Sequence, residues 1–504
     1  MSKNFILFFS IFIYFNVYSQ NITIKKGEII KDRQFLMDKN EITTNDDQGN
    51  FVSIRPHRDN GALHNYFVEL YRDLNFINRI EIETQNKSEI LDVFILNKKV
   101  HVFIKEEFDK TISLRCDIID IDTKTKTQKI LYKIDKDSSP GFFKALKNDN
   151  NISLEYSSQI ILTIPVVKDK MKYAFVKIFS NDLEILSQHS VYPEKTLSYR
   201  NIKFLKTLQY NHKIYLLFNV VNNKKDKTYK IIELNDSKEK VLEISIEENT
   251  YELIDSKIKD NQLIISGLYS KQKKGGFKGF TYYSIDLGSL TVSSQKQNPF
   301  LNKKASAFFN GFFKKNRSID IKNVFIDEQQ NTYVVGQFYV IQKQQVPIGI
   351  PIATIGSAVL ITYNPINIKY KLYDDLLIGK INTNGELEWD KVLELRQTEK
   401  ITSRSNKRDS SIFTFLSNNQ LNIFLNGYIN MKKEKLEVKQ DKRLSKTNFY
   451  NITFNPEGTI TPKIILSNKD SKIIFRAGKT VKSNNQLYIL GQGNMRKQLL
   501  NLKL

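Results

Sequence analysis

The feature that most constrains this chain is a short run of residues that recurs along it. In each copy, a polar turn with Asn or Lys leads into alternating or continuous β-branched and aromatic residues, and the run often ends in Gly. Self-similarity at a regular interval indicates a repeat architecture. The first apolar-face positions of the copies are Val52, Val100, Ile160, Ile214, Leu263, Thr332, Leu421 and Leu487.

A second pattern follows the runs and consists of two strand-like segments joined by a tight turn. It is clear in YYSIDLGSLTVSSQ (282–295), LIGKINTNGELEW (377–389) and YNITFNPEGTITPKIIL (450–466). Asn384-Gly385 is the strongest hairpin signal in the chain, because both residues tolerate a positive φ. The repeating unit is therefore several short antiparallel strands, and most units are about 50–70 residues long.

A unit of this kind cannot bury both of its faces alone, whereas stacking such units around an axis buries them. We therefore expect an all-β fold, a single β-propeller of seven or eight blades. Eight runs favour eight blades, with the last blade shared between the two ends of the chain, unless one weak run forms no blade. The strand-like stretch 22–30 would then complete the last unit and cover its open edge. An open β-solenoid and two β-sandwiches are the alternatives.

The first 19 residues have the pattern of a secretory signal peptide. Lys3 supplies positive charge, residues 5–17 are almost wholly apolar, and Val17 and Ser19 are small enough for a cleavage site before Gln20. The apolar run of about 13 residues is shorter than the roughly 20 that a membrane-spanning helix needs. We therefore expect a signal peptide at 1–19, one propeller domain at 20–504, and a secreted protein of the periplasm, cell surface or exterior.

Composition and the distribution of charge narrow the classes of binding partner that we expect for this chain. The 504 residues carry a net charge of +23 at pH 7, but the lysines are spread over the whole length, as is typical of solvated strand faces and turns. We therefore expect no nucleic-acid partner, and a specific polyanion is the alternative. The single cysteine, Cys116, cannot form an intramolecular disulfide, and a lone cysteine in a strand is usually a small buried residue.

Catalytic motifs are missing from the sequence. The five histidines never fall at zinc-ligand spacing, and nothing matches a P-loop, a G-x-S-x-G elbow or a calcium loop, so we expect no metal or other cofactor. Asp46-Asp47, Asp120 with Asp122, and Asp374-Asp375 are local carboxylate pairs, for which turn chemistry is the simpler interpretation. We expect a protein that is not an enzyme. The alternative is a glycan-cleaving enzyme that uses paired carboxylates at the propeller mouth.

Two insertions interrupt the spacing on either side of the run at Thr332. The first, 298–317, mixes aromatic and basic residues and would form an amphipathic helix that packs on the domain or lies on a membrane. The second, 346–361 (VPIGIPIATIGSAVLI), is uncharged, and its prolines argue against a regular helix. We expect the insertions to form or flank the partner surface, unless they plug the axis or cover a blade edge. The candidate residues of this surface are Phe308, Phe309, Phe312, Phe313, Ile348, Ile350, Ile352 and Ile355.

The segment 374–397 (DDLLIGKINTNGELEWDKVLELRQ) resembles a recurring segment in secreted β-propeller proteins of Bacteroidetes bacteria. There an N-x-x-G-x-[IL]-x-W hairpin is followed by an apolar-basic strand ending in Arg-Gln. The resemblance is clearest from Leu263 to Gln397 and extends elsewhere only as a repeat pattern. It implies a propeller in the cell envelope and no established activity. The function we expect is that of an exported, non-catalytic binding or scaffold protein whose partner is a protein or glycan of the envelope.

Overall fold

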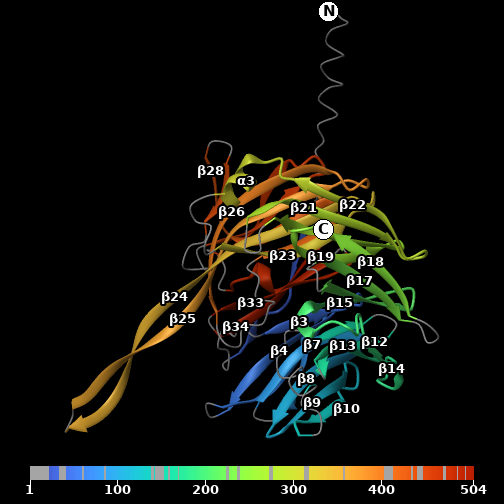
Figure 1. Cartoon of the computed structure of the whole chain (residues 1–504). Coiled ribbons are helices and arrows are strands. Elements are labelled where there is room, and N and C mark those ends of the chain that lie inside the picture. The colour runs from blue at the N-terminus through green and yellow to red at the C-terminus, as the bar shows by residue number, and fades with distance from the viewer. Residues whose placement is uncertain are drawn as a thin grey trace, which may run out of the picture.

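The computed structural model arranges the chain as eight small antiparallel sheets around one axis, an eight-bladed β-propeller (Figure 1). The expected fold class is confirmed, with eight blades rather than seven. The structure describes residues 22–32, 41–59, 62–84, 87–137, 141, 152–156, 159–168, 170–222, 226–234, 239–271, 276–310, 317–355, 358–401, 412–432, 435–439, 447–468, 473–484, 486–493 and 495–503. The expected signal peptide therefore lies outside the described residues.

Blades 1 to 4 are meanders of four strands in sequence order. Blade 1 holds β3 (Ile42–Asn45), β4 (Asn50–Asp59), β5 (Ala62–Arg72) and β6 (Asn75–Glu83). Blade 2 holds β7 (Lys87–Leu96), β8 (Lys99–Phe108), β9 (Thr111–Asp120) and β10 (Lys126–Asp135). Blade 3 holds β11 (Ser153–Tyr156), β12 (Ile160–Lys168), β13 (Met171–Phe179) and β14 (Ile185–Val191). Blade 4 holds β15 (Ile202–Tyr210), β16 (Lys213–Val221), β17 (Lys227–Leu234) and β18 (Lys240–Ile246).

Blades 5 to 8 follow the same order with additions. Blade 5 holds β19 (Tyr251–Lys259), β20 (Gln262–Ser270), β21 (Phe277–Asp286) and β22 (Thr291–Pro299), and helix α3 (Lys303–Asn310) follows it. Blade 6 holds β23 (Arg317–Ile326), β24 (Thr332–Ile355), β25 (Ala358–Ile381) and β26 (Leu387–Ile401). Blade 7 holds β27 (Ile412–Ser417), β28 (Gln420–Lys432), β30 (Asn448–Phe454) and β31 (Ile460–Ser467), with β29 (Lys435–Lys439) bridging to β26 of blade 6. Blade 8 holds β32 (Thr480–Ser483), β33 (Gln486–Gly493), β34 (Arg496–Lys503) and β1 (Thr23–Lys26).

The two sequence patterns correspond to fixed places in the blade. Every recurring run falls on a second strand, from Val52 on β4 to Leu487 on β33. The second pattern is the hairpin of the third and fourth strands. In blade 6 its turn contains Gly385 at a φ of +81°, and the Asn382 side chain accepts the backbone N–H groups of Asn384 (3.0 Å) and Glu386 (2.9 Å). The predicted Asn384-Gly385 hairpin is thus confirmed.

Closure of the ring joins the two ends of the chain, as the sequence predicts. β1 is the fourth strand of blade 8 and pairs antiparallel with β34, from Thr23 opposite Lys503 to Lys26 opposite Leu500. The short β2 (Ile30–Lys31) continues along the same strand. Blade 8 is therefore built from both ends, which leaves no blade with a missing outer strand.

The apolar core is divided into layers between blades. The described buried residues fall into eight clusters, each shared by two neighbouring blades. One example packs Phe94 and Phe103 of blade 2 against Ile164 and Phe175 of blade 3. Because each sheet buries both of its faces in this way, no described blade is stable by itself, and the ring folds as one unit.

Blade 6 differs from the others in the hairpin between its second and third strands. β24 and β25 have 24 residues each, and their outer parts leave the ring as a twisted ribbon, drawn in orange at the lower left of Figure 1. β23 pairs with β24 only as far as Val340, and β26 pairs with β25 only as far as Lys369. We call the two-stranded remainder, residues 341–368, the arm. In an antiparallel meander, the hairpins between second and third strands and the connections between blades emerge on one face of the ring, so the arm and helix α3 share that face.

Candidate functional site

The first strand of each blade surrounds the propeller axis. First strands of successive blades contact one another, for example β3 with β7 and β19 with β23. Fourth strands such as β10 and β14 lie at the rim (Figure 1). A β-bulge interrupts the first strand of blades 2, 4 and 6, at Ile90/Asp92, Phe204/Lys206 and Ile321/Asn323. Bulges of this kind re-aim a side chain, and here each one lies beside a charged residue.

Five charged residues from four consecutive first strands meet around the axis. Asp92 lies on β7, Glu155 on β11, Lys206 on β15, and Asp255 and Lys257 on β19. We call them the axial cluster. Glu155 of blade 3 interacts electrostatically with both charges of blade 5, although blade 4 lies between them. Only groups near the axis can interact across an intervening blade, so the cluster lies there.

Most members of the axial cluster have a direct partner. The Lys206 ammonium is 2.9 Å from Asp255 Oδ1 and donates to the Ser256 carbonyl oxygen at 2.9 Å. Asp255 also accepts the Ser256 backbone N–H at 2.7 Å, and Asp92 accepts the Val93 N–H at 2.8 Å. Glu155 is different, because it has no hydrogen bond or ion pair with any described residue.

The environment of Glu155 changes its proton affinity. Burial raises the pKa of the Glu155 carboxyl to about 7, with Asp92 and Asp255 adding to the rise and Lys206 and Lys257 opposing it. The carboxyl therefore exchanges a proton near neutral pH, as either a hydrogen-bond donor or an acceptor. A half-buried titratable group with a strongly shifted pKa near the axis of the fold marks a candidate functional site.

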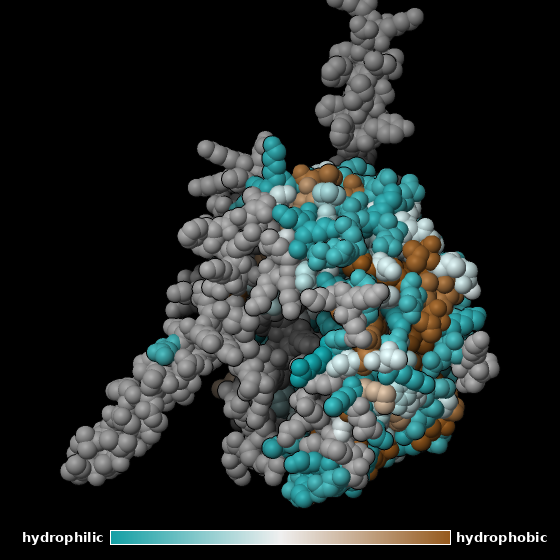
Figure 2. Space-filling model, viewed as in Figure 1, coloured by the Kyte–Doolittle hydropathy of each residue, from teal (hydrophilic) through white to brown (hydrophobic). Residues whose placement is uncertain are grey.

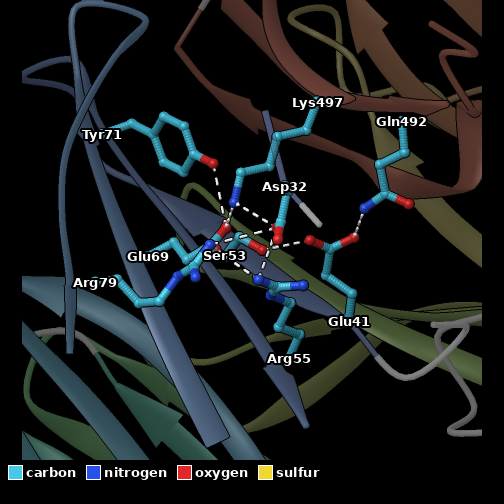
Figure 3. A network of polar contacts seen from close by, with 9 residues as sticks. All are labelled: Asp32, Glu41, Ser53, Arg55, Glu69, Tyr71, Arg79, Gln492 and Lys497. Atoms are coloured by element: carbon cyan, nitrogen blue, oxygen red, sulfur yellow. Dashed lines mark hydrogen bonds and ion pairs between the residues drawn. The ribbon is translucent and has the colours of Figure 1, made fainter. Parts of the chain in front are cut away.

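A second charged cluster lies where the ring closes (Figure 3). Asp32, which follows β2, and Glu69 on β5 face three cations: Arg55 on β4, Arg79 on β6 and Lys497 on β34. Arg55 Nη2 lies 2.7 Å from Asp32, and Arg79 Nη2 lies 2.8 Å from Glu69. Burial opposes the change, but the cations together hold the pKa of Asp32 below its ordinary value.

The same cluster continues toward the axis through Glu41. Its carboxylate accepts hydrogen bonds from the Ser53 hydroxyl and the Gln492 side-chain amide, and burial raises its pKa. The Tyr71 hydroxyl donates to Glu69 at 3.2 Å. The nine residues of Figure 3 form what we call the closure network, and they come from blade 1, blade 8 and the segment that joins them.

The closure network is a structural element rather than a binding site. The side chains of Asp32, Glu69 and Lys497 are only 1–2% exposed, so no ligand reaches them in the folded ring. Each of its carboxylates is matched by a cation or by hydrogen-bond donors on the opposite side of the seam. Removing one partner from such a buried group is costly, so the network fixes the register in which blade 8 meets blade 1.

The two insertions have different structures. The first contains α3, which begins at Lys303 and packs Ala305, together with the preceding Phe300, against Phe280 of blade 5. Phe308 and Phe309 lie in this helix, whereas Phe312 and Phe313 lie outside the described residues. The second insertion belongs to blade 6 itself and forms the distal part of the arm. The candidate residues of the second insertion are placed along β24: Ile348, Ile350, Ile352 and Ile355.

The three local carboxylate pairs have different roles, since Asp46 and Asp120 serve turns as expected, whereas Asp375 lies within β25 and accepts the backbone N–H of Leu395 on β26 at 2.9 Å. Asp46 accepts backbone N–H groups of Gln48 and Asn50 at 2.9 Å each, and Asp120 accepts those of Asp122 and Thr123. Cys116 is fully buried in β9, as expected, and burial raises the pKa of its thiol. Sequence reasoning missed Glu155, because the charged residues around it lie on other blades and no local pattern marks them.

The described residues include no group of three His, Cys, Asp or Glu side chains able to hold a metal ion. Among them, no helix is both long and apolar enough to cross a bilayer. On the face drawn in Figure 2, the coloured residues are mostly hydrophilic with apolar patches among them. Several fourth strands carry one or two exposed apolar residues, such as Ile130, Val241 and Ile464, which is ordinary for a protein surface.

No protein-family model matches the chain, and no curated protein sequence matches it. Solved structures that align with it include the WD40 domain of SCAP from fission yeast, which is 8% identical over 96% of this chain and 94% of that chain, with a TM-score of 0.38. The polysaccharide lyase Uly1 is 9% identical over 95% and 99% of the two chains, with a TM-score of 0.39. A GH32 β-fructofuranosidase from Bombyx mori is 9% identical over 95% and 90%, with a TM-score of 0.27. Structural neighbours thus include glycan-active enzymes, but at these identities and scores the likeness says nothing of activity.

Proposed function

We propose that this protein is an exported, non-catalytic binding protein of the bacterial envelope that holds a small saccharide at the axial cluster. The observation that carries the proposal is Glu155, a half-buried carboxyl with a raised pKa and no direct partner among the described residues. Its carboxyl group is open to a hydrogen bond from or to a ligand hydroxyl. The neighbouring lysines and aspartates supply donors and acceptors for further hydroxyls.

The arrangement favours binding over catalysis because the other carboxylates are engaged. Asp255 is held by Lys206 and the Ser256 N–H, and Asp92 accepts the Val93 N–H. A general base has to be free to accept a proton from water or substrate. A rigid ring that presents several fixed polar groups on its axis is suited to selecting a ligand by hydrogen bonding.

A thermal-shift screen with neutral and acidic saccharides tests the proposal, followed by calorimetric titration at pH 6 and pH 8. We expect a ligand that raises the melting temperature of the wild type. Its affinity should change across neutral pH as Glu155 ionises, and it should fall about tenfold or more in Glu155→Gln. The matched control is Glu386→Gln, an exposed glutamate in a turn of blade 6. Equal saccharide binding by wild type and Glu155→Gln would refute the axial site.

The second candidate is a glycan-cleaving enzyme, and the specific observation in its favour is again the shifted pKa of Glu155. A carboxyl with a pKa of about 7 beside carboxylates on other blades is the pair that acid–base cleavage of a glycoside requires. Release of reducing ends from polysaccharides distinguishes the two candidates. Turnover by the wild type that is lost in both Glu155→Gln and Asp255→Asn would favour the enzyme.

Export is part of the proposal and has its own test. The sequence of residues 1–19 supports a cleaved signal peptide, and the resemblance to secreted propellers supports an envelope location. We expect protein recovered from the medium or the envelope fraction to begin at or near Gln20. An intact mass that still includes residues 1–19 would contradict export by cleavage.

A further inference from the structure

The first strands of the eight blades can be compared at one height along the axis. In each blade, the residue that follows the first apolar-face position of the recurring run pairs with one residue of the first strand. Because the runs occupy equivalent places in their blades, the paired first-strand residues form one level of the ring. We call it the axial level, and its members are Thr43, Phe94, Glu155, Leu208, Lys257, Phe325, Phe415 and Val481.

Apolar side chains are the rule at the axial level. Five of the eight members are apolar, and each of the five packs in the layer between its own blade and the next. Phe94, Leu208 and Phe415 are buried there. Glu155 and Lys257 are the two charged members, on blades 3 and 5. The fold does not call for charge at this level, and departures from a repeating pattern are expected at functional sites.

Lys257 resembles Glu155 in lacking a direct partner. Its side chain is exposed, and it makes no hydrogen bond or ion pair with any described residue. The other lysine of the axial cluster, Lys206, is occupied by Asp255 and by the Ser256 carbonyl oxygen. Lys257 is therefore the cation of the axial cluster that is available to a ligand.

Glu155 and Lys257 interact through space without forming an ion pair. The Lys257 ammonium acts to lower the pKa of the Glu155 carboxyl, so the two groups lie near each other, but no direct contact joins them. On the intervening blade, the axial level is occupied by Leu208, which adds no charge between them. A ligand that reaches both groups meets a carboxyl on one side and an ammonium on the other.

The surroundings of Lys257 suit an anionic group. Asp255, two residues away on β19, is neutralised by Lys206, and Asp92 lies three blades away. Lys259, two residues further along the same strand, donates to the Asp327 carbonyl oxygen at 2.6 Å and adds a second positive charge. A hydrogen bond between an ammonium and a carboxylate is about twice as strong as one between neutral groups. A ligand carboxylate at Lys257 therefore binds better than a hydroxyl at the same place.

We propose that Lys257 makes the axial cluster selective for acidic saccharides, by binding a carboxylate of the sugar while Glu155 bonds to one of its hydroxyls. This inference rests on the proposed saccharide-binding function and names the class of sugar. With the carboxylate fixed at Lys257 and a hydroxyl at Glu155, the sugar has one orientation on the axis, which neither contact would impose alone.

Calorimetric titration of the full chain with matched sugars tests the proposal. The probes are the methyl glycosides of glucose and galactose, each compared with its uronic acid, in which a carboxylate replaces the hydroxymethyl group. We expect one of the uronic acids to bind about fivefold to tenfold more tightly than its neutral counterpart at low salt, and the preference to shrink as salt is added. Lys257→Gln should abolish this preference and leave the affinity for the neutral sugar within about twofold of the wild type.

Two further variants separate the role of Lys257 from a general effect of charge. Lys257→Arg keeps the positive charge and should retain the preference. Lys240→Gln removes an exposed lysine at the rim of blade 4 and should bind both sugars like the wild type. Equal binding of the neutral and acidic sugars, or a preference that persists in Lys257→Gln, overturns this inference. If sugar binding still requires Glu155, the proposed function stands without it, whereas failure of all four sugars to bind overturns both.

Discussion

The closure network and the axial cluster are both groups of charged side chains set away from the rim of the ring, and they are built in opposite ways. In the closure network, Asp32 and Glu69 each face several cations within 3.3 Å, across the seam between blades 1 and 8. In the axial cluster, Glu155 has charges on three other blades around it but no direct partner among the described residues.

The difference separates charge that holds a fold from charge that is available to a ligand. Matched buried charges favour one arrangement of the blades, and this preference is lost when one member of the group is removed. An unmatched carboxyl costs stability in the empty protein, and a fold retains such a cost most readily at a functional site. Substitution should therefore lower the free energy of unfolding at the closure network and raise it at the axial cluster.

Glu69→Gln should have the largest effect, because it leaves two buried cations, Arg55 and Lys497, and the partly exposed Arg79 facing Asp32 alone. We expect the free energy of unfolding to fall by about 3–5 kcal/mol, measured by chemical denaturation. The control is Glu386→Gln, which removes an exposed glutamate paired with Lys296 and should stay near the wild-type value. A fall of less than about 1 kcal/mol in Glu69→Gln would mean that the seam does not depend on these charges.

Lys497→Met should be milder although it removes a residue of the same network. Asp32 and Glu69 then face two arginines in place of three cations, so their charges are matched one to one, and the methionine chain fills much of the same space. We expect a loss on the order of 1–2 kcal/mol in the same denaturation experiment. A loss equal to that of Glu69→Gln would show that charge balance is not what the network optimises.

Glu155→Gln should stabilise the protein, but only at higher pH. The folded-state pKa of about 7 lies above the ordinary 4.5, so this group favours folding most at low pH and loses that contribution as pH rises through 7. Glutamine cannot ionise, so the variant should be more stable than the wild type by about 1–3 kcal/mol at pH 8 and nearly equal at pH 4. Thermal melts across this range measure the difference, and a pH-independent difference would contradict the proposed cause.

An exposed ion pair should give the smallest effect and sets the scale for the others. Lys99 and Asp182 lie 3.4 Å apart with side chains 42% and 79% exposed. A double-mutant cycle with both residues replaced by alanine should report a coupling of about 0–1 kcal/mol that shrinks as salt is added. A coupling as large as that in the closure network would mean that burial is not the property that separates strong pairs from weak ones.

The architecture was predictable because the same physical unit repeats. Each second strand is buried on both faces, which imposes an apolar run such as that at Leu421, and each hairpin after it needs turn residues such as Asn384 and Gly385. The completion of blade 8 by the N-terminal strand followed from a strand-like stretch at one end and a missing outer strand at the other. None of these inferences required knowledge of distant contacts.

The axial cluster was not predictable for the converse reason. Asp92 and Glu155 lie one blade apart in sequence and Glu155 and Asp255 two blades apart, and each looks like one of many charged residues in a strand. Their proximity arises only when the ring closes, and the bulges that re-aim neighbouring side chains leave no clear sequence signal. The arm was found in sequence as an apolar insertion, but its form as a ribbon became visible only from the register of β24 and β25.

Closure of the ring by β1 also means that this strand waits for its partner during synthesis. Thr23 pairs with Lys503, so among the described strands the first to be synthesised must wait for the last. At about 5–20 residues per second, that wait lasts on the order of half a minute or longer. An unpaired strand is meanwhile a template on which other chains can assemble. Lys25 and Lys26, which are exposed in the finished ring, make this strand a poor template and so protect the protein before the ring exists.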